Sequence, residues 1–153
     1  MFMKTLLLAL LVSVSFQMEN FLQEDEILLG VSGSQIVNLA RSKLGCSYVY
    51  GAAGPDTFDC SGLTTWVFQQ VGIYLSRTAS AQANGGVTVA YENLQPGDLV
   101  FYNTSGSGVS HVGIYTGNGK MIHAPKTGDV VKEVSIHNNS YWTPKFVTAK
   151  RYY

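Results

Sequence analysis

The first apolar segment of the chain is a short run over residues 6–14, which a single basic residue, Lys4, precedes. A membrane-spanning helix needs about 20 apolar residues, and this run is roughly half as long. A basic start, a short apolar run and small residues behind it are typical of a secretory signal peptide. The pattern predicts a signal peptide over residues 1–15, cleaved near Ser15. An uncleaved first helix is the alternative.

Residues 16–33 carry acidic side chains and end in a cluster of Gly and Ser, which is typical of a linker or a short leader. The apolar residues of 34–44 then recur at helical spacing. Ser34 suits the first cap of this helix, and Gly45 suits its end. We therefore expect the folded domain to cover residues 34–153.

The next helical pattern begins at Cys60 or Ser61 and places apolar side chains at i, i+4 and i+8. Gly72 supplies a stop for this helix. Asp59 then falls at or next to the N-cap, where a carboxylate is a favoured acceptor. A further helical turn is expected at 80–83.

The second half of the chain changes from helical spacing to short β-branched and aromatic runs separated by Gly, Asn, Asp and Pro. Such runs are typical of strands joined by turns. Helices followed by strands predict an α+β fold, papain-like in outline, with N-terminal helices packed on one face of a C-terminal antiparallel β-sheet. The predicted strands lie within residues 98–103, 111–116, 120–125, 129–136 and 146–153.

Composition narrows the class of protein. The 153 residues are 46% hydrophobic and 13% charged, which suits one domain with a buried core. Ten basic residues balance ten acidic ones, so no net field attracts nucleic acid or an anionic membrane. Cys46 and Cys60 are too few for a disulfide scaffold, and with His111, His123 and His137 they show no metal-binding spacing. We expect no metal and no cofactor.

Cys60 has the position of a nucleophile. A thiol in the first turn of a helix faces unpaired backbone N–H groups and the positive end of the helix dipole, both of which favour thiolate. The same N–H groups can stabilise an oxyanion when the sulfur attacks a carbonyl. The alternative is a buried structural cysteine that begins a core helix.

A cysteine nucleophile needs a base and a group that orients the base, and His111 and His123 are the candidates. They lie on successive predicted strands. If the connecting loop has three residues with Gly119 in the left-handed conformation, both imidazoles share one face of the hairpin, close enough for a ring-to-ring hydrogen bond. A two-residue turn of Asn118 and Gly119 would instead separate them. We expect the odd loop, although each residue could also be an ordinary strand histidine.

Four segments in this order resemble the NlpC family of papain-like cell-wall cysteine peptidases: PDTFDCSGLTTWVFQQVG, LSRTASAQ, LQPGDLVFY and SHVGIYTGNGKMIHAP. The resemblance covers residues 34–153, and its most specific parts are the D-C-S-G box and the later H-V-G-I-Y strand. It implies that Cys60 is the nucleophile, His111 the base and His123 the third polar residue. This agrees with the assignment made from spacing.

The resemblance also implies residues that contact substrate. Tyr48 should lie near the nucleophile, bind substrate and, with Ser61, assist the oxyanion. Asp59 and Ser61 match positions that meet a free substrate amine in some members. Arg77 resembles an arginine near the cleft that could pair with a substrate carboxylate, and Ser110 precedes the base. A structural tyrosine, a simple N-cap and a surface arginine are the corresponding alternatives.

Two departures from the family pattern concern the wall of the cleft. Cys46 and Ser47 stand before the tyrosine where the family usually has Pro, and Gly51 with Ala52 replaces a Gly-Gly pair. Cys46 would lie near Cys60 in an oxidising space. A disulfide between them would abolish activity, and the sequence leaves this pairing open.

The favoured interpretation is a secreted, extracytoplasmic and monomeric cysteine endopeptidase that cleaves peptidoglycan stem peptides. The resemblance implies the γ-D-glutamyl-diaminopimelate bond. No stable membrane insertion is expected after signal cleavage. The same three residues could act on another amide, such as a muramoyl-L-alanine bond or a protein. A secreted wall-binding protein without activity is the other class.

Overall fold

The computed structural model describes residues 2–28 and 30–153, which form two compact units, one ending at Val31 and one covering Ser32–Tyr153. Residues 1 and 29, which fall in the predicted signal peptide and linker, lie outside the described residues. Within the part that is described, no helix is both long enough and apolar enough to cross a membrane.

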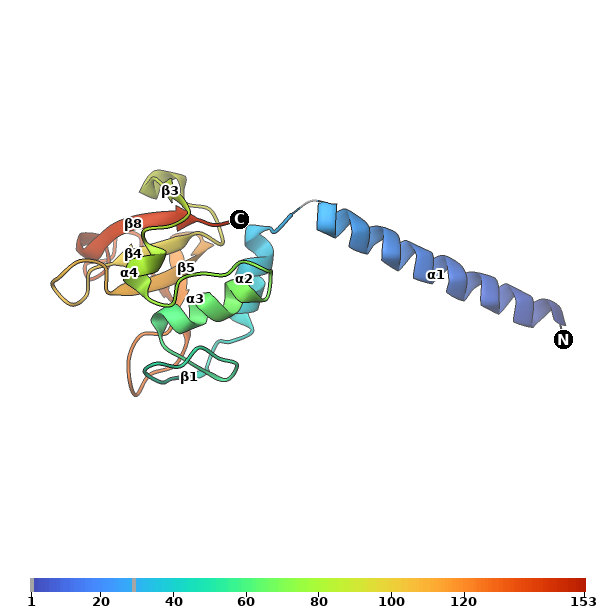
Figure 1. Cartoon of the computed structure of the whole chain (residues 1–153), viewed down its shortest axis with the longest axis horizontal. Coiled ribbons are helices and arrows are strands. Elements are labelled where there is room, and N and C mark those ends of the chain that lie inside the picture. The colour runs from blue at the N-terminus through green and yellow to red at the C-terminus, as the bar shows by residue number, and fades with distance from the viewer. Residues whose placement is uncertain (1, 29) are drawn as a thin grey trace. The chain divides into compact units, whose positions relative to one another are not determined.

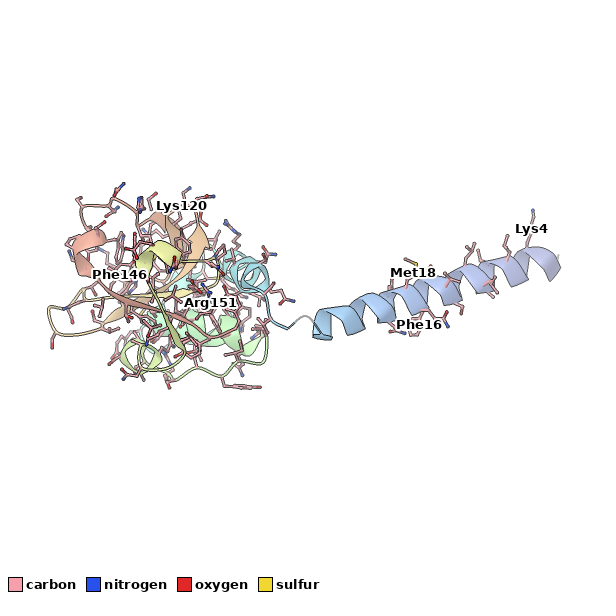
Figure 2. The ribbon with its side chains drawn as sticks, turned by 90° about the horizontal axis from the view of Figure 1, so that it is seen from above. Lys4, Phe16, Met18, Lys120, Phe146 and Arg151 are labelled. Carbon is pink, nitrogen blue, oxygen red and sulfur yellow. The ribbon has the colours of Figure 1, made fainter. Side chains whose placement is uncertain are left out.

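The N-terminal unit is a single helix, α1 (Phe2–Leu28). It runs through the predicted cleavage point at Ser15, and the predicted linker is helical as far as residue 28, because no Gly or Pro interrupts the chain before Gly30. Its described apolar side chains are exposed, and Phe16 and Met18 project from the helix in Figure 2. A segment with so much exposed apolar surface fits a leader better than part of a core. Cleavage stays a prediction.

Helix α2 (Gly33–Arg41) begins and ends earlier than predicted. The cap is Ser32, whose hydroxyl accepts from Gln35 N while the Gln35 side chain accepts from Ser32 N. This reciprocal capping box satisfies two end groups, whereas Ser34 alone could satisfy one. Leu44, which the helical pattern included, is 44% exposed and lies in the turn after the helix.

Helix α3 (Cys60–Gln69) confirms the second predicted helix, including Asp59 as its N-cap. Helix α4 (Ala79–Gln82) occurs where a helical turn was expected. Helices α2 and α3 pack on each other, and all three helices contact strand β5 (His111–Gly117), as Figure 1 lets the reader follow. The buried apolar side chains of α2 and α3 are Ile36, Val37, Ala40, Leu63, Val67 and Phe68.

The rest of the domain is a six-stranded sheet of order β3-β8-β4-β5-β6-β7, antiparallel at every pair. The α+β class predicted from the sequence is therefore confirmed. Five strands match predicted segments, whereas β3 and the short parallel pair β1-β2 were not predicted. The bounds are β1 Ser47–Tyr48, β2 Thr57–Phe58, β3 Val87–Val89, β4 Leu99–Tyr102, β6 Lys120–His123, β7 Lys132–Ser135 and β8 Phe146–Arg151.

The β5-β6 hairpin places His111 and His123 on the same face, as predicted, but for a different reason. Its turn is the two-residue Asn118-Gly119, both at positive φ (52° and 70°), as a type I′ turn requires. The ladder pairs Gly117 with Lys120 and then shifts by one residue before Tyr115. This bulge supplies the extra residue that the prediction assigned to the loop. Ile114 therefore pairs with Ile122, and odd-numbered residues of both strands share a face.

Two buried layers flank the sheet. Val100 and Tyr102 of β4 belong to a cluster on one face, together with Met121, Ile136 and others. The alternate residues of β4, Leu99 and Phe101, are fully buried and point to the opposite face, where the helices pack. Strand β4 is therefore the centre of the domain.

A buried ion pair fixes β4 to β8. Asp98 is 0% exposed and accepts from Arg151 Nε at 2.7 Å, Arg151 Nη2 at 2.8 Å and Gln95 N at 2.8 Å. Asp98→Ala should lower the free energy of unfolding by about 3 kcal/mol, because it leaves these donors without their acceptor. Urea denaturation measures this change. Asp56→Ala, at an exposed position that joins no ion pair among the described residues, is the control and should change stability by less than about 0.5 kcal/mol.

Candidate active site

Cys60 is the first residue of α3, and a loop is held tightly against this end of the helix. Asp59 N donates to Ala52 O at 2.8 Å. A Cβ on Gly62 would lie 1.9 Å from the same carbonyl oxygen, so only glycine permits this approach. Position 62 is therefore restricted to glycine, because the loop that contains Ala52 packs against it. This loop forms the wall beside Cys60.

The structure brings most of the predicted site residues together around a hollow of about 510 Å³, here called the Cys60 hollow. Sequence reasoning missed Tyr50, which is 87% exposed at its rim, and the residues that follow Arg77 on its wall. Predicted residues that line the hollow are Tyr48, Asp59, Cys60, Ser61, Arg77 and Ser110.

Asp59 organises this hollow. Its carboxylate accepts from Gly62 N at 2.7 Å and Gly51 N at 3.0 Å, and from both Arg77 Nη atoms, at 3.0 and 2.7 Å. Burial alone would raise the pKa of Asp59, but these hydrogen bonds and the Arg77 charge bring it below its ordinary value. The carboxylate is therefore ionised at neutral pH.

Arg77 has a different partner from the one that the resemblance implied. Its planar fork is engaged by Asp59, and its Nη1 also donates to Ser61 Oγ at 2.9 Å. The Asp59 carboxylate, which also caps the nitrogen of Gly62 three positions on, is fixed in place and binds the guanidinium through both of its oxygens. Arg77 is thus placed to hold Asp59 and Ser61 in position, and its fork is not free for a substrate carboxylate.

Gln82 was missed by sequence reasoning although it joins α4 to α3. This side chain is fully buried, accepts from Thr64 Oγ1 at 2.7 Å, and donates to Ser61 O at 3.3 Å and Ser76 O at 2.8 Å. A buried amide satisfied in this way is rigid. It fixes the segment that carries Arg77 against the start of α3. A polar residue in a short helical turn gives no sequence signal for such a role.

The surroundings of Cys60 differ from the expectation of a stabilised thiolate. Burial raises the pKa of the Cys60 thiol, and the neighbouring charge of Asp59 raises it further, whereas hydrogen bonds from the backbone of Val112 and Ser61 lower it. The helix end is thus outweighed by burial and a carboxylate. The contact with Val112 also places the sulfur beside the start of β5, where His111 lies.

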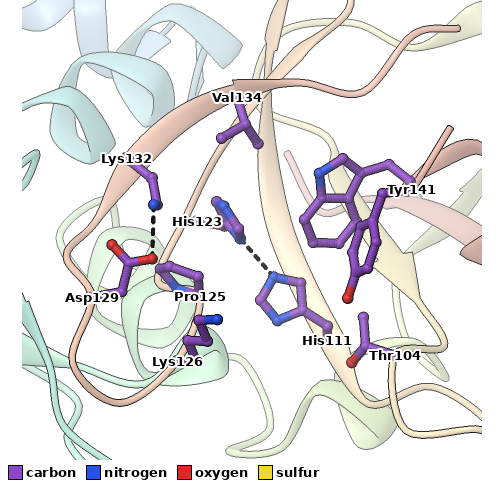
Figure 3. A pocket seen from close by; sticks show the side chains of 10 residues that line it. Thr104, His111, His123, Pro125, Lys126, Asp129, Lys132, Val134 and Tyr141 are labelled. Carbon is purple, nitrogen blue, oxygen red and sulfur yellow. Dashed lines mark hydrogen bonds and ion pairs between the residues drawn. The ribbon is translucent and has the colours of Figure 1, made fainter. Parts of the chain in front are cut away.

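His111 and His123 share one face of the hairpin, as predicted, and His111 Nε2 lies 2.8 Å from His123 Nδ1 (Figure 3). The rings are only 5% and 3% exposed. Burial lowers the pKa of His111 to about 4 and that of His123 to about 3. Both rings are therefore neutral at pH 7. The contact with His123 occupies Nε2 of His111, so Nδ1 is the ring nitrogen of His111 that remains to accept a proton from elsewhere.

Trp142 was also missed, and it covers the histidine pair. Its ring stacks on His111 at 5.5 Å between centroids and 25° between planes, and it meets His123 edge-on at 5.3 Å. This contact fixes both imidazole planes and excludes water from one side of the pair. Trp142 comes from the irregular segment between β7 and β8, whose path no periodicity in the sequence predicts.

A second hollow, of about 440 Å³, lies on the other side of His111 and is here called the histidine hollow. Figure 3 shows its lining, in which the two imidazoles, a pair of lysines and two aromatic rings surround the space. Ser110 Oγ of the Cys60 hollow lies 2.9 Å from Thr104 Oγ1 of the histidine hollow. The two hollows therefore adjoin where β5 begins.

Tyr48 lies on β1, which pairs with β2 just before α3. Burial raises the pKa of its hydroxyl, and the charges of Cys60 and Asp59 raise it further, so this group is a neutral donor beside the thiol. Cys46 and Cys60 are both free thiols. Across the residues that the structure describes, no group of three or more His, Cys, Asp or Glu side chains is arranged to hold a metal ion.

The fold and site define a papain-like α+β domain with a cysteine at a helix N-terminus and a histidine pair on the sheet. Residues 45–151 match the NlpC/P60 family. The chain belongs to this family.

Curated relatives agree with this assignment. A probable endopeptidase of Corynebacterium glutamicum is 50% identical over 106 residues, which are 69% of this chain and 49% of that protein. The probable endopeptidase p60 of Listeria seeligeri is 49% identical over 106 residues, 69% of this chain and 20% of that protein. The chain thus spans half or less of the length of these relatives.

Solved structures show the same fold. An NlpC/P60 family protein from Bacillus cereus superposes with a TM-score of 0.76 at 31% identity, over 80% of this chain and 41% of that one. The NlpC/p60 domain of the peptidoglycan hydrolase SagA gives a TM-score of 0.70 at 34% identity, over 80% of this chain and 100% of that one.

The raised pKa of Cys60 is testable by alkylation. In a Cys46→Ser background, the rate of reaction of Cys60 with iodoacetamide should rise with pH through and beyond 9.0, the ordinary thiol value. A thiol whose pKa is raised stays protonated below that value, and only the thiolate reacts. A rate that already reaches a plateau near pH 6 would show a thiolate-imidazolium pair instead.

Proposed function

We propose that this protein is a cysteine endopeptidase that hydrolyses an amide bond in peptidoglycan stem peptides. The observation that supports it most is the placement of Cys60 at the start of α3, beside β5, whose His111 forms a buried hydrogen-bonded pair with His123 of β6. The relatives named endopeptidases and the structural neighbour named a peptidoglycan hydrolase support the substrate class.

The reaction begins with a neutral thiol and a neutral imidazole. Cys60 Sγ attacks the amide carbonyl as His111 Nδ1 takes its proton, and His123 Nδ1 accepts from the Nε2–H of the resulting imidazolium. The oxyanion forms near the backbone N–H groups at the start of α3 and near the Tyr48 hydroxyl. His111 then protonates the leaving amine as the C–N bond breaks, which gives a thioester.

Water completes the cycle. His111, neutral again, takes a proton from a water molecule that attacks the thioester carbonyl, and the collapse of the second oxyanion releases the acid product and the thiol. His123 keeps the tautomer of His111 constant through both halves. Trp142 supports this role because it holds both rings in fixed planes.

The finer assignments also belong to this proposal. The bond is the γ-D-glutamyl-diaminopimelate bond, the protein acts outside the cytoplasm after removal of residues 1–15, and it works as a monomer. The exposed apolar side chains of α1 support the leader, since nothing in a packed domain would leave so many of them in water.

The catalytic assignment is tested with purified peptidoglycan and with synthetic stem peptides, whose fragments are weighed by mass spectrometry. Cys60→Ala and His111→Ala should each lower the rate at least about 1,000-fold, and His123→Ala about 100-fold. Cys46→Ser is the matched control and should keep the parent rate. If Cys60→Ala digests wall as well as the parent, the protein is not a cysteine peptidase. A new amino terminus on L-alanine would identify a muramoyl-alanine amidase.

The acyl half of the substrate should bind through its free amine. Among the described residues that line the Cys60 hollow, Asp59 is the one acid, and its pKa is lowered, so it stays charged. Acetylating the amino terminus of an L-alanyl-γ-D-glutamyl substrate should lower kcat/KM about tenfold, because a charge-assisted hydrogen bond is lost. Equal kcat/KM for free and acetylated peptides would remove Asp59 from substrate recognition.

A further inference from the structure

The histidine hollow contains charges that the hydrolysis mechanism does not use. Lys126, Asp129 and Lys132 lie on its wall, opposite the side that carries Tyr141 (Figure 3). None of these residues reaches the thiol side of the site, since the Cys60 hollow has a different lining. A charged recess beside the general base therefore needs an explanation of its own.

The position of the recess identifies which half of a substrate enters it. His111 must give a proton to the leaving nitrogen, so the leaving half passes close to its ring. The Cys60 hollow, on the sulfur side, is left for the acyl half. The Ser110–Thr104 contact joins the two hollows at the start of β5, so an extended peptide with its carbonyl at Cys60 can occupy both.

The charge of the recess identifies the chemistry of that half. Asp129 is engaged by Lys132 at 2.7 Å, and these two charges offset each other. Within residues 2–28 and 30–153, no ion pair includes Lys126, which is exposed. Asp129 N donates to Lys126 O at 3.1 Å, so Lys126 begins the turn that carries Asp129. The histidine hollow thus carries one uncompensated positive charge.

The histidine at the base of the recess adds a donor. As the proposed base, His111 needs a free lone pair at Nδ1, so its Nε2–H donates to His123 Nδ1 and His123 carries its own proton at Nε2. This atom is buried and has no hydrogen-bond partner among the described residues. His123 pairs with Lys132 in the β6–β7 ladder, so the ring lies beside this lysine. The wall therefore presents an unpaired cation, and the buried ring behind it keeps a donor with no acceptor.

We propose that the histidine hollow is the subsite for the leaving half of the substrate, and that Lys126 selects a leaving half that carries a free carboxylate. The proposal rests on the hydrolase function above and specifies its substrate. In a diaminopimelate stem peptide, the carboxylate is either that of the diaminopimelate side chain or that of the chain terminus. Lys126 binds substrate in this assignment and takes no part in proton transfer.

The test measures kcat/KM for three L-alanyl-γ-D-glutamyl-diaminopimelyl-D-alanine peptides. One is unmodified, one has the side-chain carboxylate of diaminopimelate converted to an amide, and one has the terminal carboxylate converted to an amide. The parent should lose about tenfold on one of the two amides, and that arm identifies the carboxylate that is bound. Lys126→Gln should lose about tenfold on the unmodified peptide and little on that amide.

Two further variants separate recognition from structure. Lys120→Gln removes an exposed lysine at the other end of β6, labelled in Figure 2, and should leave all three values unchanged. Lys126→Glu should favour a peptide with L-lysine in place of diaminopimelate, a reversal that a purely structural role cannot produce.

The outcomes distinguish this proposal from the one on which it rests. If the parent cleaves all three peptides equally well and Lys126→Gln does the same, the subsite assignment is wrong while the hydrolase function stands. If the parent cleaves none of these peptides or purified wall, the function itself fails.

Discussion

The carboxylate of Asp59 is the interaction on which the site depends. It caps α3 through Gly62, holds the preceding loop through Gly51, and holds the segment after α3 through Arg77. Three segments, whose donors lie three, eight and 18 residues from Asp59, thus meet at one acid directly beside Cys60. Removing any of these donors would leave a mostly buried charge short of partners, which explains why the arrangement is so fully bonded.

This arrangement has an electrostatic cost for the reaction. Burial opposes ionisation of the Cys60 thiol, and the negative charge of Asp59, which orders the wall of the Cys60 hollow, opposes it further. The histidines are buried as well, so neither charged form is favoured before substrate arrives. A site of this kind forms charge only as the transition state forms, and a fixed donor network then lowers the barrier without prior reorganisation.

Much of this organisation could be predicted from local sequence. The start of α3, its Asp cap and the stop at Gly72 follow from rules that act within a few residues. The placement of His111 and His123 on one face was also predicted correctly, but the prediction assumed a three-residue loop. The hairpin instead has a two-residue turn and a bulge, which also place both side chains on one face. The sequence pattern predicts that the two histidines share a face. It cannot distinguish a three-residue loop from a two-residue turn followed by a bulge, because both give this result.

The errors have a common physical cause, which is contact between distant segments. Arg77 was expected to face substrate, but tertiary folding brings it to Asp59. The stacking of Trp142 on His111 depends on an irregular connection whose course is fixed only by packing. The early start of α2 is the exception. The Ser32–Gln35 capping box spans only four residues and is a stronger helix-start pattern than Ser34 alone.

The two hollows together impose a direction on the substrate. The Cys60 hollow has Asp59 as its acid, and Arg77 already binds that acid, so the positive charge there is committed. The histidine hollow has Lys126 as its uncompensated cation. The Cys60 hollow thus has no net charge, and Lys126 favours the orientation in which a carboxylate lies on the leaving half of the peptide. In the proposed mechanism, the acyl half then lies in the Cys60 hollow and the leaving half lies beside His111, which protonates its nitrogen.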